Sequence, residues 1–271
     1  DVVLHFSAHG GGEALLEQVR ASGKPIVLLP NLALNRVGGE NRATIEHHLS
    51  LADLVVFRAE CDRRAALEMF RLDPARVHTA PLAVAPCFGV PADPHIFPVI
   101  YAGEQDYVLW VGILEECKNQ LGAIRALRDL DLPVIFVGSY RDRSYFDACR
   151  AEAPGHFRFV PHLTPKSEAL RSAYQNCRLY LEVPLEPPGM SALEAGLAGA
   201  GMVLSDCPWS REYFGDGAVL VDPASPAAIR EGVAAALARP RDDAPAARIA
   251  QAHRAPDALK RLVDLMAGAC R

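Results

Sequence analysis

Three features are scarce in this sequence of 271 residues: long apolar runs, basic charge and export signals. No apolar run approaches the ~20 residues that a membrane-spanning helix needs, and no charged start followed by a short apolar run marks an exported protein. The formal net charge is −5, without a basic stripe, whereas a nucleic-acid binder needs a Lys/Arg excess on at least one face. We therefore expect a globular protein that has no transmembrane segment and binds no nucleic acid.

Patterns for disulfides and metal ions are missing as well. The seven cysteines are spread along the chain and form no C-x-x-C pair, which is typical of reduced thiols in a cytoplasmic protein. The nine histidines provide no H-x-x-x-H pair on a predicted helix, and the adjacent His47 and His48 point to different helix faces. We expect neither a metal site nor another cofactor.

Half of the residues are apolar, which is enough for one large core or two modest cores. Continuous apolar runs alternate with segments of helical periodicity, and this alternation predicts an α/β protein with doubly wound parallel sheets. Ligands of such sheets bind at the carboxyl ends of the strands. The predicted strands are residues 2–6, 25–29, 54–57, 77–82, 107–111, 134–138, 158–161, 179–183, 202–205 and 218–221.

Proline is dense between residues 81 and 98, where no regular element can extend far. We place a domain boundary in this segment, with one domain at residues 1–95 and a second at residues 96–255. Only three or four strands precede the boundary, so we expect the first domain to be incomplete or reduced. The final amphipathic segment, residues 256–271, predicts a helix.

The stretch from residue 179 to residue 222 combines a strand, a loop, a helix and a second strand. Two prolines after Glu186 end the strand pairing, and Gly189 permits close approach of a ligand to the backbone. The first turn of the helix, at Met190 and Ser191, leaves its amides unpaired, and such a turn receives anions and hydroxyl-rich ligands. Glu194 follows about two turns into the helix, so its carboxylate and that of Glu186 would lie about 10 Å apart along one wall. This arrangement favours an elongated ligand.

The same stretch resembles a known family, the retaining glycosyltransferases of family four, in their donor-binding half. Three runs carry the resemblance: E-P-P-G-M-S-A-L-E-A-G at residues 186–196, S-D at 205–206 and R-E-Y-F-G-D-G-A-V-L-V-D-P at 211–223. It implies the GT-B fold, in which two Rossmann-like parallel-sheet domains face a cleft and the last helix crosses back to the first domain. In that family the first Glu lies near the transferred sugar and the second binds the nucleotide ribose, so the resemblance gives these roles to Glu186 and Glu194.

A second segment, G-I-L-E-E-C-K-N at residues 112–119, resembles the glycine-loop-lysine segment of the same family. By this resemblance Gly112 lets a phosphate approach the backbone, and Lys118 neutralises the diphosphate, whose negative charge grows as it leaves. Many family members have Arg at the position of Ile113 or of Cys117, and this sequence has neither. Diphosphate binding would then rest on Lys118 and on backbone amides.

Other strand ends supply further candidates for the donor site. Arg141 and Arg143 could assist in binding the diphosphate. Gly138 ends the strand at residues 134–138 and would face the same cleft. The backbone near Leu163 borders the nucleobase by resemblance to the family.

Two histidines, His5 and His9, lie at the carboxyl end of the first predicted strand, where family members often place a His near the donor sugar. An exposed or structural role is equally compatible with each of them. We select His9 as the catalytic candidate beside Glu186, because the glycines after His9 would leave it accessible.

The resemblance as a whole implies a glycosyltransferase that moves a sugar from a nucleotide-sugar donor to a glycan or lipid-linked acceptor with retention, as in polysaccharide or glycoconjugate biosynthesis. No metal is needed, because fixed cations and helix dipoles replace it. The protein would be cytoplasmic, in solution or peripherally associated with the inner face of the membrane. The alternative is a catalytically weak glycosyltransferase-like module that binds a nucleotide or a partner within a larger protein, as the missing arginines and the short first domain suggest. A further GT-B enzyme, such as a nucleotide-sugar epimerase, would need a catalytic pattern that is not visible here.

Overall fold

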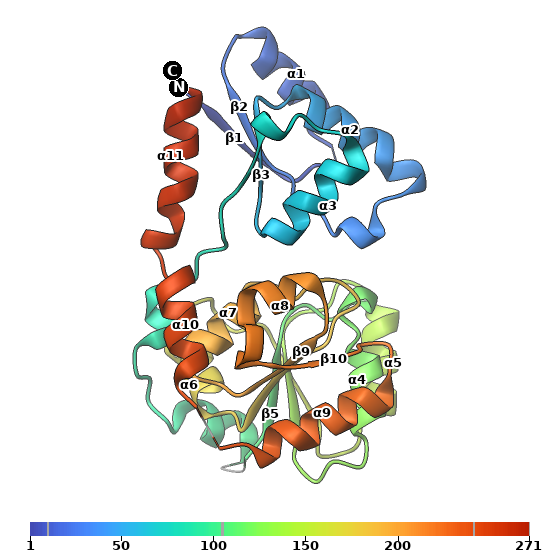
Figure 1. The fold of residues 1–271 in the computed structure, drawn as a ribbon. Helices are drawn as coiled ribbons and strands as arrows, with labels where there is room; N and C mark the ends of the chain where they lie inside the picture. Colours follow the sequence, from blue (N-terminus) through green and yellow to red (C-terminus); the bar gives the residue numbers. More distant parts are fainter. Residues whose placement is uncertain (10, 104–105, 241, 271) are drawn as a thin grey trace. The chain divides into compact units, whose positions relative to one another are not determined.

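A computed structural model describes residues 1–9, 11–103, 106–240 and 242–270. The chain forms two compact units, the first made of Asp1–Ala83 and Ala255–Arg271 and the second of Val84–Arg254 (Figure 1). The sequence placed the first boundary after residue 95, whereas residues 84–95 belong to the second unit. Hydrogen bonds explain the difference: the Ala92 backbone N donates to Gln175 Oε1 at 2.9 Å, and Gln175 Nε2 donates to the Val90 carbonyl at 2.8 Å.

The first unit contains a four-stranded parallel sheet in the order β1-β2-β3-β4. Side chains of successive strand residues point to opposite faces. Ile26 and Leu28 therefore pack with α1, α2 and α3, while Val27 and Leu29 pack with Leu262 of α11. Helix α11 lies on the opposite side of this sheet from α2 and α3 (Figure 1). The elements are β1 (Val3–Phe6), α1 (Glu13–Ala21), β2 (Ile26–Leu29), α2 (Arg42–Leu51), β3 (Leu54–Phe57), α3 (Glu60–Phe70), β4 (Val77–Thr79) and α11 (Lys260–Ala269).

The second unit contains a six-stranded parallel sheet in the order β10-β9-β8-β5-β6-β7. Helices cover both faces, with α4, α5 and α9 on one and α6, α7, α8 and α10 on the other. The strands are β5 (Val108–Val111), β6 (Val134–Val137), β7 (Arg158–Val160), β8 (Leu179–Glu182), β9 (Met202–Ser205) and β10 (Val219–Val221). The helices are α4 (Gln120–Leu127), α5 (Arg143–Glu152), α6 (Glu168–Asn176), α7 (Met190–Leu197), α8 (Pro208–Phe214), α9 (Pro226–Ala238) and α10 (Ala244–His253).

Short helical turns complete the two units, and α10 is the one long helix that the sequence reasoning did not predict. Helix α10 packs closely on α7 at Gly196, where an added Cβ atom would overlap the Ile249 Cδ1 atom. Across the described residues, no helix combines the length and the apolar character needed to span a membrane. The short turns are Leu34–Arg36, Gly39–Asn41, Pro74–Arg76, Pro86–Gly89, Pro98–Ala102, Glu116–Lys118, Gly215–Gly217 and Asp257–Leu259.

Candidate functional site

The order of strands in the second unit locates the candidate site. From β5 the chain builds outward to β6 and β7, then returns to the other side of β5 and builds outward through β8, β9 and β10. The direction of winding therefore reverses between β5 and β8, and ligands of open α/β sheets bind beyond the carboxyl ends of the strands at such a reversal. The loops at 112–119 and 183–189 follow these two strand ends.

The loop after β5 is held against the end of β6. The Gly112 backbone N donates to the Val137 carbonyl at 3.0 Å, and the Leu114 N donates to the Ser139 carbonyl at 2.8 Å. A Cβ atom at Gly138 would overlap the Gly112 carbonyl oxygen, so only glycine allows the two loops to approach this closely. Gly112 and Gly138, both predicted at the site, thus meet through their backbones.

Asn119, which the sequence reasoning did not select, joins three loops of the site. Its backbone has φ of 63°, and its Nδ2 donates to the Val183 carbonyl at 3.0 Å and to the Pro223 carbonyl at 2.8 Å. These carbonyls follow β8 and β10. Asparagine tolerates the left-handed conformation, and its amide supplies two donors, so one side chain fixes the turn and its neighbours.

Lys118 and Glu186 form an ion pair between the two central loops. Lys118 Nζ lies 2.6 Å from Glu186 Oε1, and the side chains are only 20 % and 19 % exposed. The Leu185 backbone N donates to the Cys117 carbonyl at 2.8 Å and draws the loops together. Burial lowers the pKa of Lys118, but the hydrogen bond and charge of Glu186, with the charge of Glu182, outweigh it and leave the pKa raised. Lys118 is therefore a charged group at neutral pH.

The first turn of α7 begins at Gly189, which caps the helix without a side-chain hydrogen bond. The amides at the start of such a helix have no partner within it, which suits an anion. The Ser191 Oγ donates to Glu182 Oε2 at 2.9 Å, and the Gly189 N donates to Glu182 Oε1 at 3.4 Å. Glu182 ends β8, and its place in an otherwise apolar strand is the sequence signal that could have identified it.

Glu194, one turn further along α7, is paired with the Tyr174 phenol, which donates to Glu194 Oε2 at 3.0 Å. Burial, assisted by the charge of Glu182, raises the pKa of Glu194 to about 7, against the lowering effects of Tyr174 and Lys166. The carboxyl therefore changes charge near neutral pH. Lys166 lies in the loop after β7, close to the partly buried Leu163 that was predicted to border a nucleobase.

The two arginines considered as helpers are engaged by other carboxylates. Arg141 Nη1 lies 3.0 Å from Glu115 Oε2, and Arg143 Nε lies 2.9 Å from Asp147 Oδ2 one turn along α5. Within the described residues, no group of three His, Cys, Asp or Glu side chains could hold a metal ion.

His9 belongs to the first unit, where it lies exposed after β1, and its backbone N donates to Ser7 Oγ at 3.4 Å. Its neighbour His5 instead stacks on the buried His48, with ring centroids 5.8 Å apart. Burial, followed by the charge of His48, lowers the pKa of His5. The choice of His9 over His5 as an accessible side chain fits this difference, and its catalytic role stays a prediction.

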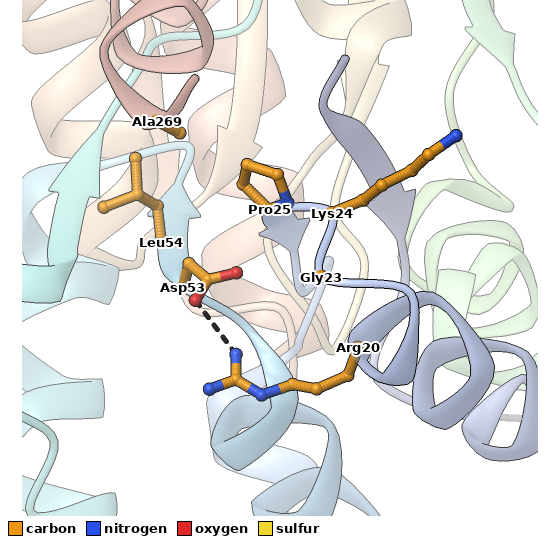
Figure 2. A pocket seen from close by; sticks show the side chains of 7 residues that line it. All are labelled: Arg20, Gly23, Lys24, Pro25, Asp53, Leu54 and Ala269. Carbon is orange, nitrogen blue, oxygen red and sulfur yellow. Dashed lines mark hydrogen bonds and ion pairs between the residues drawn. The ribbon is translucent and has the colours of Figure 1, made fainter. Parts of the chain in front are cut away.

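A hollow of about 440 Å³ in the first unit lies at the amino ends of β2 and β3 (Figure 2). The Arg20 guanidinium donates to Asp53 Oδ1 at 2.9 Å, and Asp53 Oδ2 accepts from the Ile26 N at 2.8 Å, so these groups fix the strand starts. Parallel sheets bind ligands at the other ends of their strands, so the hollow is not a candidate donor site. Its lining consists of Arg20, Gly23, Lys24, Pro25, Asp53, Leu54 and Ala269.

The family of the chain follows from comparison with known proteins. Residues 95–255, more than half of the chain, match the family model described as glycosyl transferases group 1. The chain belongs to this family. It is therefore a glycosyltransferase, and the residues that match include both central loops and α7. No curated protein sequence matches the chain.

Solved structures resemble this glycosyltransferase over nearly its whole length. The HepE protein of Anabaena in complex with UDP-glucose has a TM-score of 0.82 at 14% identity, with 98% of this chain and 78% of that chain covered. A UDP-forming α,α-trehalose-phosphate synthase from Burkholderia xenovorans has a TM-score of 0.79 at 13% identity, with 100% and 74% covered. Sucrose-phosphate synthase from Thermosynechococcus elongatus has a TM-score of 0.77 at 18% identity, with 93% and 70% covered. At these identities the likeness shows the GT-B fold, with its two Rossmann-like parallel-sheet units.

Proposed function

We propose that this glycosyltransferase takes its sugar from a UDP-sugar and transfers it, with retention of anomeric configuration as in family four, to a glycan or lipid-linked acceptor. The observation that carries the proposal is the partly buried ion pair of Lys118 and Glu186 at the winding reversal between β5 and β8. Uridine is supported by the similar structures, since HepE was solved with UDP-glucose and the Burkholderia synthase is UDP-forming.

The diphosphate of the donor would be bound by Lys118 and by the first amides of α7, after Gly189. Lys118 is charged, and the helix start adds the positive end of a dipole, so two fixed groups of the same sign converge on the leaving group. Glu194 would accept hydrogen bonds from the ribose hydroxyls. The backbone near Leu163 would border the base. These groups stabilise the charge of the leaving diphosphate, and the proposal needs no metal ion.

The ion pair itself suggests how the donor engages Glu186. Lys118 pairs with Glu186 until the diphosphate, which carries more negative charge, takes the carboxylate's place on the ammonium. Glu186 would then turn from Lys118 to the sugar hydroxyls or to the positive charge that develops at the anomeric carbon. Replacement of Glu186 by the diphosphate on Lys118 would therefore couple diphosphate binding to the movement of the catalytic carboxylate toward the sugar.

Polysaccharide or glycoconjugate biosynthesis is the setting that such a transfer suits. We place it in the cytoplasm, with peripheral association at the inner face of the membrane when the acceptor is lipid-linked. The cysteines support a reducing compartment, because none of them forms a disulfide among the described residues.

The test is incubation of the purified chain with UDP-, GDP- and ADP-sugars, with release of nucleoside diphosphate as the measurement. We expect UDP release that rises with a glycan or lipid-linked acceptor, and NMR of the product should show the donor's anomeric configuration. Glu152→Gln, far along α5 in an exposed pair with Arg125, is the control that should keep full activity. Binding of UDP without turnover would instead support a nucleotide-binding module, and inversion would contradict retention.

A further inference from the structure

Glu182 is a carboxyl group that the proposed reaction does not use, yet it lies within the donor site. It is the last residue of β8, its exposure is 3 %, and its neighbours Leu181 and Val183 are fully buried. Its carboxyl oxygens accept from three donors. The Tyr180 phenol lies 2.7 Å from Oε2, and the Ser191 hydroxyl and the Gly189 backbone N complete the set at 2.9 and 3.4 Å.

Such a group is costly to bury. An unpaired carboxylate in an apolar interior loses several kcal/mol of hydration, and hydrogen bonds must offset the loss. Burial raises the pKa of Glu182, while its bond from Tyr180 and the charge of Lys118 oppose the rise. An apolar residue would suit a buried strand end at lower cost, so the fold of β8 does not require Glu182. Two of its three donors, however, lie at the start of α7: Gly189 caps the helix and Ser191 belongs to its first turn.

We propose that Glu182 is a positioning residue of the donor site, which holds Gly189 and Ser191 so that the first turn of α7 is ready for the diphosphate. The role rests on the proposed function, because it assigns that turn to the leaving group. Tyr180 orients the carboxyl from the same face of β8, two residues away. Burial raises the pKa of the Tyr180 phenol, so it stays a donor throughout the range in which the enzyme would work.

After burial, the charge of Glu182 also raises the pKa of Glu194, and this gives the proposal a signature of its own. The charged and titratable groups that face Glu194 are Tyr174 on α6, Lys166 before α6 and Glu182 on β8. The negative charge of Glu182 raises the pKa of Glu194, so removing it should let Glu194 ionise at lower pH. A residue that only filled space would not move this titration.

The experiment uses the full chain with two variants, Glu182→Gln and Tyr180→Phe. Hydrogen exchange of the peptide spanning residues 184–192 is measured without nucleotide, and the Kd of UDP is measured by calorimetry between about pH 5.5 and 9. Glu152→Gln and Tyr145→Phe are the matched controls. They remove a carboxylate paired with Arg125 and a phenol that accepts from the Leu121 N, both outside the Glu182 network.

Glu182→Gln should speed exchange in the 184–192 peptide several-fold and weaken UDP binding about tenfold at pH 8. UDP affinity should fall as the pH decreases through the pKa of Glu194, about 7 in the parent chain, and in Glu182→Gln this fall should occur at lower pH. Tyr180→Phe should do the same to a smaller extent, because without its hydrogen bond Glu182 holds its charge less well. The controls should change none of these quantities.

Unchanged exchange in both variants would overturn the positioning role, as would a loss of UDP affinity that is equal at every pH. If Glu182→Gln does not fold, Tyr180→Phe carries both measurements. Failure of the parent chain to bind UDP, with faster exchange in the variants, would contradict the UDP donor and leave the positioning of the turn supported.

Discussion

The two sheets of this glycosyltransferase are both parallel, but only one of them reverses its winding. In the first unit the described strands follow chain order, β1-β2-β3-β4, whereas the second unit runs β10-β9-β8-β5-β6-β7. The loops after β5 and β8 flank this reversal, and the partly buried Lys118–Glu186 pair joins them. Near the carboxyl end of β1, His5 instead stacks on His48 of α2. A parallel sheet thus gains a site within its own unit where its winding reverses.

The same contrast explains how each sheet is covered. Crossovers between parallel strands are right-handed, so a sheet built in one direction receives all its crossover helices on one face. In the first unit α1, α2 and α3 share a face, and α11, which begins just over two hundred residues after β3 ends, covers the other through Leu262. The second sheet needs no such distant helix for this purpose, because its reversal brings crossover helices to both faces.

The largest effect should come from Lys118→Ala, which tests whether the second unit holds the diphosphate. The variant loses a charge-assisted bond to the diphosphate and the positive charge that offsets Glu186, so we expect the Kd of UDP to rise about a hundredfold. Uridine binding should change about twofold or less, because the base and ribose contacts remain. Calorimetry with both ligands measures the difference, and equal losses for UDP and uridine would show that Lys118 is not the phosphate cation.

The two carboxylates of the second unit should separate by kinetics. Glu186→Ala should chiefly lower kcat, because this side chain matters most when the glycosidic bond breaks, and Glu194→Ala should chiefly raise KM. Each effect should be roughly tenfold to hundredfold, the size expected for one charge-assisted hydrogen bond. Steady-state rates at saturating acceptor give both constants. Exchanged signatures would reverse the assigned roles, and unchanged turnover in both variants would contradict the proposed mechanism.

Glu194 should also reduce the stability of the second unit at neutral pH. Its pKa is about 7 in the folded chain and near 4.5 when unfolded, so its contribution to stability is full below pH 4.5 and is lost as pH rises through 7. The loss is about 3 kcal/mol. Glu194→Gln keeps an acceptor for Tyr174 and should be more stable than the parent by about 1–3 kcal/mol at pH 8, with little difference at pH 5. Urea unfolding at both pH values checks this, and a gain of equal size at pH 5 would exclude the titration as its cause.

The smallest change in nucleotide affinity should come from the first unit. His9→Ala should leave the Kd of UDP within about twofold, because nucleotide contacts are assigned to the second unit, yet kcat should fall if His9 faces the sugar. His5→Ala serves as the comparison, since His5 is stacked on His48 rather than exposed. A tenfold rise in the UDP Kd of His9→Ala would mean that the first unit contributes to nucleotide binding.

Much of the architecture followed from the sequence because strand and helix periods are local. Every predicted strand is present, most within one residue of its predicted bounds, although β4 stops at Thr79, before the proline at position 81. The loop after β5 and the start of α7 were also recognisable, because their glycines and prolines have backbone requirements that can be read one residue at a time. Helix α10 was missed because its short Ala-rich pattern follows a proline-containing segment and differs little from that segment in composition.

Only the tertiary structure decided which of these residues meet. Lys118 and Glu186 are far apart in the chain, and their pairing depends on the reversal that places β8 beside β5. Tyr174 and Glu194 meet because α6 and α7 pack against each other. Glu182 looked like one polar residue in an apolar strand until Gly189 and Ser191 were found to donate to it. The sequence determined the elements, because propensity and periodicity act over a few residues. Strand order determined the pKa shifts of the site residues, because burial and Coulomb interactions depend on neighbours in space.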